Sequence, residues 1–299
     1  MLLEDITSKR VLIRFDYNVP MSEGKIVNDF RIRQSYETIN ALLQQDNKLI
    51  IASHLGRPTE GQYESSLSLL PVCNYVSEKL NQKIKFIPNF TDSISFDDYH
   101  IAMLENVRFN IGEKACDKDL SKSLASIADI FVFDAFGVAH RKEASTYGVS
   151  NYIDYSAGPL LMSEIKNAQK LLKNFSKPLC TIVSGAKIST KLTLLNTFLE
   201  KSDHVILGGG ILNTFLEAQG YSIGKSLSEP SFLDESKKIL NSKNCKKIIF
   251  PDDVVCAEDG VLENPQTKDI SMVKSNDKIL DVGVDSISKY TKILRVCQT

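Results

Sequence analysis

The chain has 299 residues, of which 42% are hydrophobic and 24% are charged, as in an ordinary globular protein. Its 36 basic residues balance 37 acidic ones, so net charge does not favour nucleic acid or a membrane surface as a partner. The six cysteines lack the spacing of a zinc site, and the N-terminal residues lack a secretory signal. We therefore expect a cytoplasmic protein with no nucleic-acid partner and no membrane association, long enough for about two domains.

In the first half, apolar runs alternate with stretches of helical periodicity. Strands are predicted at 11–16, 49–52, 85–87, 101–104 and 130–133. Helices are predicted from apolar spacing at 36–43, 72–80 and 120–127. This alternation predicts a doubly wound parallel sheet.

A second alternating series follows. The residues around 151–158 show no apolar periodicity, which indicates a domain boundary. Strands are then predicted at 179–183, 205–207 and 248–250, and a last helix at about 286–295. We expect an α/β fold of two doubly wound parallel-sheet, Rossmann-like lobes. The expected division is a first domain at 1–155, a connecting helix or hinge at 156–175 and a second domain at 176–299.

The segment from Ser53 to Pro58 follows the predicted strand 49–52 and carries a histidine and an arginine. Ligands of open parallel sheets collect at the carboxyl ends of the strands, and a glycine such as Gly56 lets the backbone come close to them. The segment therefore favours an anionic ligand. The alternative is a solvated turn with two surface side chains.

Basic side chains lie near the ends of several predicted strands in the first half. They are Arg14, Arg31, His54, Arg57, Arg108, His140 and Arg141. Because parallel strands end at one edge of their sheet, these side chains can assemble a local basic site. Arginine suits this site because its planar group binds carboxylate and phosphate through two parallel hydrogen bonds. Asp16 and Asn18 would bind a ligand hydroxyl or orient the arginines, or only form the turn before Pro20.

In the second half, the loop Gly185-Ala186-Lys187 between a strand and a helix is typical of a phosphate cradle, although it is not a Walker A loop. Lys187 and Lys191 would share one helical face if the helix starts early, and both could then reach a polyphosphate. A pair of surface lysines is the alternative. The run of glycines at 208–210 would admit a nucleotide ring or form a flexible strand exit.

Several motifs together carry a family resemblance. They are VLIRFDYNVP at 11–20, SHLGRP at 53–58, LENVRF at 104–109, DAFGVAHR at 134–141, SGAKISTK at 184–191, LGGGILNTFL at 207–216 and GKSL at 224–227. In this order and spacing they resemble phosphoglycerate kinase from Val11 to about Arg295. The resemblance implies reversible phosphoryl transfer between 1,3-bisphosphoglycerate and ADP, giving 3-phosphoglycerate and ATP, with Mg²⁺ accompanying the nucleotide.

The resemblance also assigns residues. Substrate binding falls to Asp16, Asn18, Arg31, His54, Gly56, Arg57, Arg108, His140 and Arg141. Nucleotide binding falls to Gly185, Lys187, Lys191, Gly209 and Gly210. Arg31 and Lys187 become the catalytic residues, which would neutralise charge on the transferring group, and closure about a hinge near 151–175 would align the substrates.

The sequence departs from the family pattern at Ser184, Thr190, Val138 and Glu143, none of which removes a charged ligand. The family continues beyond this chain with an NGPMGVFE segment and a later GGGD segment that includes the magnesium ligand. We therefore expect a truncated nucleotide lobe, no identifiable metal ligand in this chain, and a monomer.

Two functions remain open at this point: a glycolytic kinase, or a catalytically impaired chain that binds 3-phosphoglycerate without turnover. A dinucleotide-dependent oxidoreductase is disfavoured because no G-x-G-x-x-G with a suitably spaced acidic residue is present.

Overall fold

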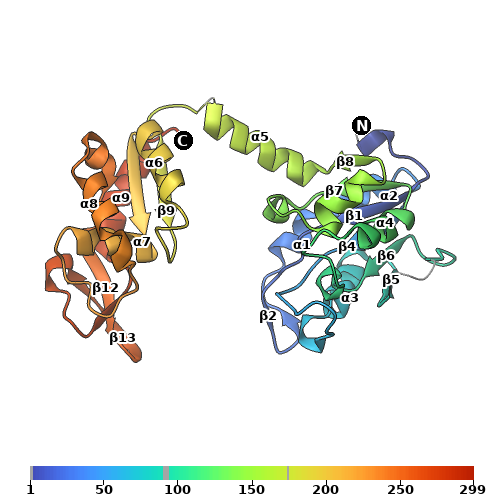
Figure 1. The fold of residues 1–299 in the computed structure, drawn as a ribbon, viewed down its shortest axis with the longest axis horizontal. Coiled ribbons are helices and arrows are strands. Elements are labelled where there is room, and N and C mark those ends of the chain that lie inside the picture. The colour runs from blue at the N-terminus through green and yellow to red at the C-terminus, as the bar shows by residue number, and fades with distance from the viewer. Residues whose placement is uncertain (1–2, 90–93, 174) are drawn as a thin grey trace. The chain divides into compact units, whose positions relative to one another are not determined.

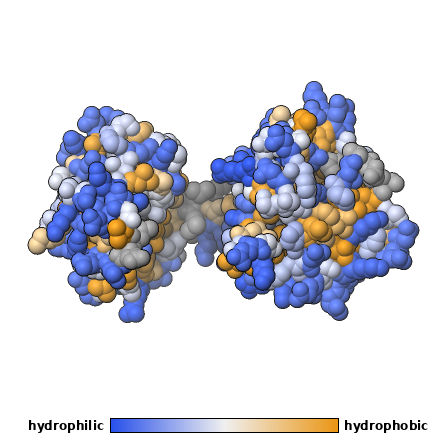
Figure 2. Space-filling view, turned by 90° about the horizontal axis from the view of Figure 1, so that it is seen from below, coloured by the Kyte–Doolittle hydropathy of each residue, from blue (hydrophilic) through white to orange (hydrophobic). Residues whose placement is uncertain are grey.

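The structure is a computed structural model that describes residues 3–89, 94–173 and 175–299. The chain divides into two compact units, Met1–Ala168 and Gln169–Thr299. Polar side chains cover most of the face of the molecule seen in Figure 2, with apolar ones in smaller groups between them. Within the described residues, no helix is both long and apolar enough to span a membrane.

The first unit is built on a six-stranded parallel sheet with the strand order β5-β6-β4-β1-β7-β8 (Figure 1). Its strands are β1 (Arg10–Arg14), β4 (Lys48–Ala52), β5 (Ile84–Ile87), β6 (Ile101–Leu104), β7 (Ile130–Phe133) and β8 (Tyr155–Ala157). A small antiparallel hairpin comprises β2 (Met21–Ser22) and β3 (Lys25–Ile26). The helices are α1 (Phe30–Gln34), α2 (Tyr36–Leu43), α3 (Leu70–Leu80), α4 (Lys118–Ser126) and α5 (Pro159–Lys173). The predicted parallel sheet is confirmed.

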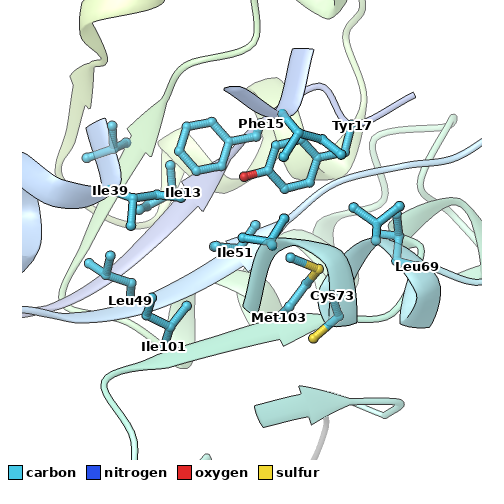
Figure 3. Packing of buried hydrophobic residues seen from close by; sticks show 14 of the residues in the cluster. Ile13, Phe15, Tyr17, Ile39, Leu49, Ile51, Leu69, Cys73, Ile101 and Met103 are labelled. Atoms are coloured by element: carbon cyan, nitrogen blue, oxygen red, sulfur yellow. The ribbon is translucent and has the colours of Figure 1, made fainter. Parts of the chain in front are cut away.

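Both faces of this sheet are buried. Val11 and Ile13 of β1 belong to an apolar cluster on one face, and Leu12 belongs to a second cluster on the other. Figure 3 shows Ile13, Ile51 and other strand residues packed in the first cluster. Burial on both faces explains why the strands are continuous apolar runs without polar alternation.

The central position of β1 defines where a ligand can bind. The chain runs from β1 to β4 on one side of the sheet and later adds β7 and β8 on the other side. Ile13 pairs in register with Ile51 of β4 and with Val132 of β7, so these three strands end together. A change in winding direction leaves a crevice beyond the carboxyl ends of such strands.

The second unit contains two separate three-stranded sheets. The parallel sheet has the order β11-β10-β9, and the antiparallel sheet has the order β13-β12-β14. The strands are β9 (Cys180–Ser184), β10 (His204–Gly208), β11 (Ile248–Ile249), β12 (Asp253–Glu258), β13 (Val261–Asp269) and β14 (Asp277–Val282). The helices are α6 (Leu192–Lys201), α7 (Gly209–Ala218), α8 (Leu233–Leu240) and α9 (Val284–Val296). The α/β class is confirmed, and the antiparallel sheet is an element that the sequence did not predict.

The boundary region also differs in detail from expectation. The strand β8 extends the first sheet to Ala157 by pairing with β7, so a first domain that ends at 155 would divide this strand. Its sequence, Tyr-Ser-Ala, carries no apolar pattern. The division between the compact units falls inside α5, within the expected connecting segment 156–175.

Candidate functional site

The loops that follow β1 and β4 are tied together at the carboxyl edge of the first sheet. The Ser53 hydroxyl donates to the Phe15 carbonyl at 2.9 Å and accepts from the Tyr17 amide at 2.8 Å. Tyr17 also stacks on Phe15, with ring centroids 5.4 Å apart. Ser53 and His54 are buried, so His54 is not the surface side chain of the alternative interpretation, whereas Arg57 is exposed.

Gly56 connects two of the predicted site residues. Its amide donates to Asn18 Oδ1 at 2.9 Å, and its carbonyl accepts from Arg108 Nη1 at 3.0 Å. The backbone φ of Gly56 is +63°, and a Cβ there would lie 2.6 Å from Leu67 Cδ2. The positive φ favours glycine at this position, whereas the end of the Leu67 side chain could move aside.

Arg14 lies fully buried beneath these loops, with an exposed fraction of 0%. Its guanidinium donates to the Phe15 carbonyl, to Ser145 Oγ at 3.0 Å and to His54 Nδ1 at 3.2 Å. Ser145 in turn donates its amide, at 3.0 Å, and its hydroxyl to the buried carboxylate of Glu113. Arg14 therefore supports the site from inside the protein.

His54 is a neutral group in this setting, which corrects the expectation that it adds a cation. Only 2% of the residue is exposed, and burial, followed by the positive charges of Arg14 and Arg108, lowers its pKa to about 2. Because a guanidinium has only donors, Nδ1 accepts from Arg14 and the ring proton lies on Nε2. His54 can therefore donate one hydrogen bond to a ligand without contributing charge.

Asp16 orients Arg31 at the open side of the site. Its Oδ2 accepts from Arg31 Nη1 at 2.6 Å, while the arginine side chain stays 50% exposed. Its other oxygen accepts from the Asn18 amide at 3.2 Å, so the turn interpretation and the orienting interpretation both hold. A Cβ at Gly137 would lie 2.6 Å from Asp16 Oδ2. A pocket of about 280 Å³ opens beside this pair, between α1 and the loops after β1 and β7.

The remaining predicted cations differ in how they are held. Arg57 and His140 are exposed and form no hydrogen bond or ion pair with the described residues. Arg141 is partly exposed and lies 3.8 Å from the Glu143 carboxylate, which also contacts the buried Arg108 at 3.3 Å. The sequence did not assign Glu113, Ser145 or Glu143 to this site. Glu143 differs from the family pattern, but isolated polar residues in loops give no pattern by which to find the other two.

In the second unit, the loop after β9 packs closely on the start of α7. The Ile211 amide donates to the Gly185 carbonyl at 3.1 Å. A Cβ at Gly210 would lie 2.3 Å from the Ala186 carbonyl oxygen, and Gly209 has a φ of +60°. These glycines begin a helix, so they are not a flexible strand exit. The arrangement brings Gly185, Gly209 and Gly210 together.

The two lysines of this loop do not share a helical face, because α6 begins only at Leu192 and both lysines precede it. The Lys191 ammonium instead folds back over the loop, 2.8 Å from where a Cβ on Gly185 would lie. The loop itself is held by Glu229, which accepts from the Ser189 amide at 2.8 Å and from its hydroxyl at 2.7 Å. Both lysines still lie in the segment that joins β9 to α6, beside the glycines.

The fold and the two candidate sites define a class: α/β proteins with several arginines at the strand ends of one unit and a lysine- and glycine-rich strand–helix loop on the other. The family model described as phosphoglycerate kinase matches residues 3–299. Phosphoglycerate kinase from Coxiella burnetii is 44% identical, with a TM-score of 0.79, and the match covers 98% of this chain and 76% of that one. Phosphoglycerate kinase from Pyrococcus horikoshii OT3 is 26% identical, with a TM-score of 0.83, and the match covers 96% of this chain and 76% of that one. The chain belongs to the phosphoglycerate kinase family.

The neutral state of His54 predicts a pH-dependent stability. The unfolded histidine has a pKa of 6.5 and the folded one about 2, so between these values only the unfolded state binds the proton. Acidification therefore favours unfolding, and between about pH 7 and about pH 5.5 this group alone should remove about 1 kcal/mol of unfolding free energy. Urea denaturation of the wild type and of His54→Gln at both pH values isolates the effect.

His54→Gln should reduce the pH dependence of the wild type by the amount given above. Equal pH dependence in the wild type and in His54→Gln would contradict the buried, neutral imidazole.

Proposed function

We propose that this chain catalyses the reversible transfer of a phosphoryl group between 1,3-bisphosphoglycerate and ADP, giving 3-phosphoglycerate and ATP. The observation that carries the proposal is the arginine-rich site at the carboxyl edge of the first sheet, in a chain of the phosphoglycerate kinase family. Its glycolytic role in the cytoplasm and its monomeric state are further parts of the proposal.

In this proposal the first unit binds phosphoglycerate. Arg31 and Arg57 have exposed guanidinium groups that suit phosphate and carboxylate oxygens. Arg108 and Arg141 add positive charge from the loops after β6 and β7. The ligand hydroxyl and remaining oxygens would be bound by the other predicted residues, namely Asp16, Asn18, His54, Gly56 and His140.

The second unit would bind the nucleotide. A loop that leads from a parallel strand towards a helix presents backbone amides to phosphate groups, and Lys187 and Lys191 would balance their charge. Gly185, Gly209 and Gly210 keep side chains away from this surface. The close packing of the two glycine segments supports a preformed site for the nucleotide.

The chemistry requires no general base. In the direction of ATP consumption, a carboxylate oxygen of 3-phosphoglycerate attacks the γ-phosphorus, an oxygen–phosphorus bond forms, and the bond to the ADP oxygen breaks. Because the attacking oxygen already carries a negative charge, the protein has to position the reactants and neutralise charge on the transferring group. We assign this neutralisation to Arg31 and Lys187.

Magnesium would arrive with the nucleotide. Among the residues that the structure describes, no cluster of three His, Cys, Asp or Glu side chains is arranged to hold a metal ion. Mg²⁺ in kinase sites is bound largely by substrate phosphates, and it supplies charge neutralisation there. In this proposal Lys187 and Lys191 would bind the phosphates that hold the metal, and the proposed roles of the residues do not depend on a protein cage for it.

An activity assay tests the proposal directly. With ATP, Mg²⁺ and 3-phosphoglycerate, we expect this chain to form 1,3-bisphosphoglycerate, detected by a coupled dehydrogenase. Lys187→Ala should lower the rate at saturating substrate about a hundredfold or more, because it removes charge stabilisation of the transferring group. Binding of 3-phosphoglycerate without turnover in the wild type would instead support the alternative, a binding protein that lacks the kinase activity.

A second prediction concerns the substrate site alone. Arg57→Ala should weaken 3-phosphoglycerate binding by about tenfold to a hundredfold, because it removes a charge-assisted hydrogen bond. Isothermal titration calorimetry measures this change.

Arg33→Ala is a matched control, because Arg33 lies on the same helix as Arg31. Its side chain is 58% exposed, and its Nε lies 3.0 Å from Asp29 Oδ1. This substitution removes the same net charge but should change affinity by less than about twofold, since exposed pairs contribute little. Similar losses in both variants would mean that only overall charge matters and that Arg57 has no specific role.

A further inference from the structure

A buried carboxylate lies among the arginines of the substrate site. The Glu143 side chain is 5% exposed, and its Oε1 lies 3.3 Å from Arg108 Nη2 and 3.8 Å from Arg141 Nη1. The Arg108 side chain is equally buried. A negative charge at this place opposes the binding of an anionic ligand while it holds two of the groups expected to bind that ligand.

The contact between Glu143 and Arg108 is incomplete. Arginine and carboxylate often pair through two parallel hydrogen bonds. Here Nη2 alone contacts Oε1, and within the described part of the chain Arg108 Nε and Glu143 Oε2 are buried without a hydrogen-bond partner. Arg108 therefore keeps an unused buried donor next to the site, although its charge is partly balanced.

The position of Glu143 is fixed by its own backbone. Its amide donates to Thr146 Oγ1 at 3.1 Å, and its carbonyl accepts from the amides of Tyr147 and Gly148, each at 3.0 Å. The turn Ala144–Gly148 that follows is largely buried. These hydrogen bonds hold the backbone of Glu143, and its side chain contacts Arg108, whose Nη1 also donates to the Gly56 carbonyl at 3.0 Å.

We propose that Glu143 is a positioning residue of the substrate site. It orients Arg108 and Arg141, and its negative charge makes the affinity of the site for phosphoglycerate lower than it would be without that charge. The identity of the ligand rests on the proposed function. The effect on anion affinity rests only on the local charges. Weaker anion binding favours release of phosphoglycerate after each turnover.

Two substitutions separate orientation from charge. Glu143→Gln keeps an oxygen that can accept from Arg108 and removes the negative charge, so it should tighten 3-phosphoglycerate binding by about three- to tenfold. Glu143→Asp keeps the charge but withdraws it by one methylene group, so Arg108 loses its contact and binding should weaken by about threefold or more. A merely structural role predicts weaker binding in both variants.

The experiment is calorimetry of the full chain with 3-phosphoglycerate and, separately, with inorganic sulfate. Glu78→Gln is the matched control, since its side chain is 76% exposed and it makes the same chemical change in the same unit. We expect no change in affinity for this control. In an assay of turnover, Glu143→Gln should lower the KM for 3-phosphoglycerate without a matching rise in kcat.

The inference is overturned if Glu143→Gln binds both anions no more tightly than the wild type, or if Glu143→Asp binds them equally well. If Glu143→Gln does not fold, Glu143→Asp tests the orientation of Arg108 only, and equal binding of the anions by that variant still overturns the inference. A wild type that binds sulfate but not 3-phosphoglycerate would overturn the proposed function. In that case a rise of sulfate affinity in Glu143→Gln would still support the role of Glu143.

Discussion

The candidate site at the carboxyl edge of the first sheet depends on the buried guanidinium of Arg14. This group joins the end of β1, the His54 loop after β4 and the turn that contains Ser145, which are far apart in the sequence. Removing a charge from water is costly, and burial lowers the pKa of Arg14 despite the nearby carboxylate of Glu113. The hydrogen bonds to three partners offset this cost and hold the loops in a fixed arrangement before any ligand binds.

This buried layer separates the site into two electrostatic parts. Inside, burial and then the charge of Arg14 lower the pKa of His54, and the hydrogen bond from Arg14 leaves the ring proton on Nε2. Outside, Arg31 and Arg57 keep exposed guanidinium groups that can bind phosphate and carboxylate oxygens. The separation gives the protein a local basic site although its net charge is close to zero. Such a site suits phosphoryl transfer, in which fixed positive charges stabilise the transferring group.

The sequence predicted the first sheet well because each strand is a short apolar run, and β6 and β7 coincide with the predicted residues 101–104 and 130–133. It could not predict β8, which depends on pairing with β7, or the antiparallel strands between 253 and 282. Both arise from contacts between segments and leave little trace in local periodicity.

The same limit applies to the site. The arginines could be predicted from the sequence because they follow predicted strands, and the carboxyl ends of parallel strands lie at one edge of the sheet. Burial of His54 and the carboxylates at Glu113 and Glu143 follow from the way separate loops pack, which no single motif encodes. The start of α6 at Leu192 likewise shows that the spacing of Lys187 and Lys191 does not define a helical face.

The central claim is that the loops after β1, β4, β6 and β7 form a preassembled site for phosphoglycerate. A crystal structure of this chain grown with 3-phosphoglycerate tests it most directly. The account predicts density for the ligand against Arg31 and Arg57, with Arg14 and His54 unmoved beneath it. Ligand density elsewhere on the molecule, or a rearranged Arg14, would contradict the account.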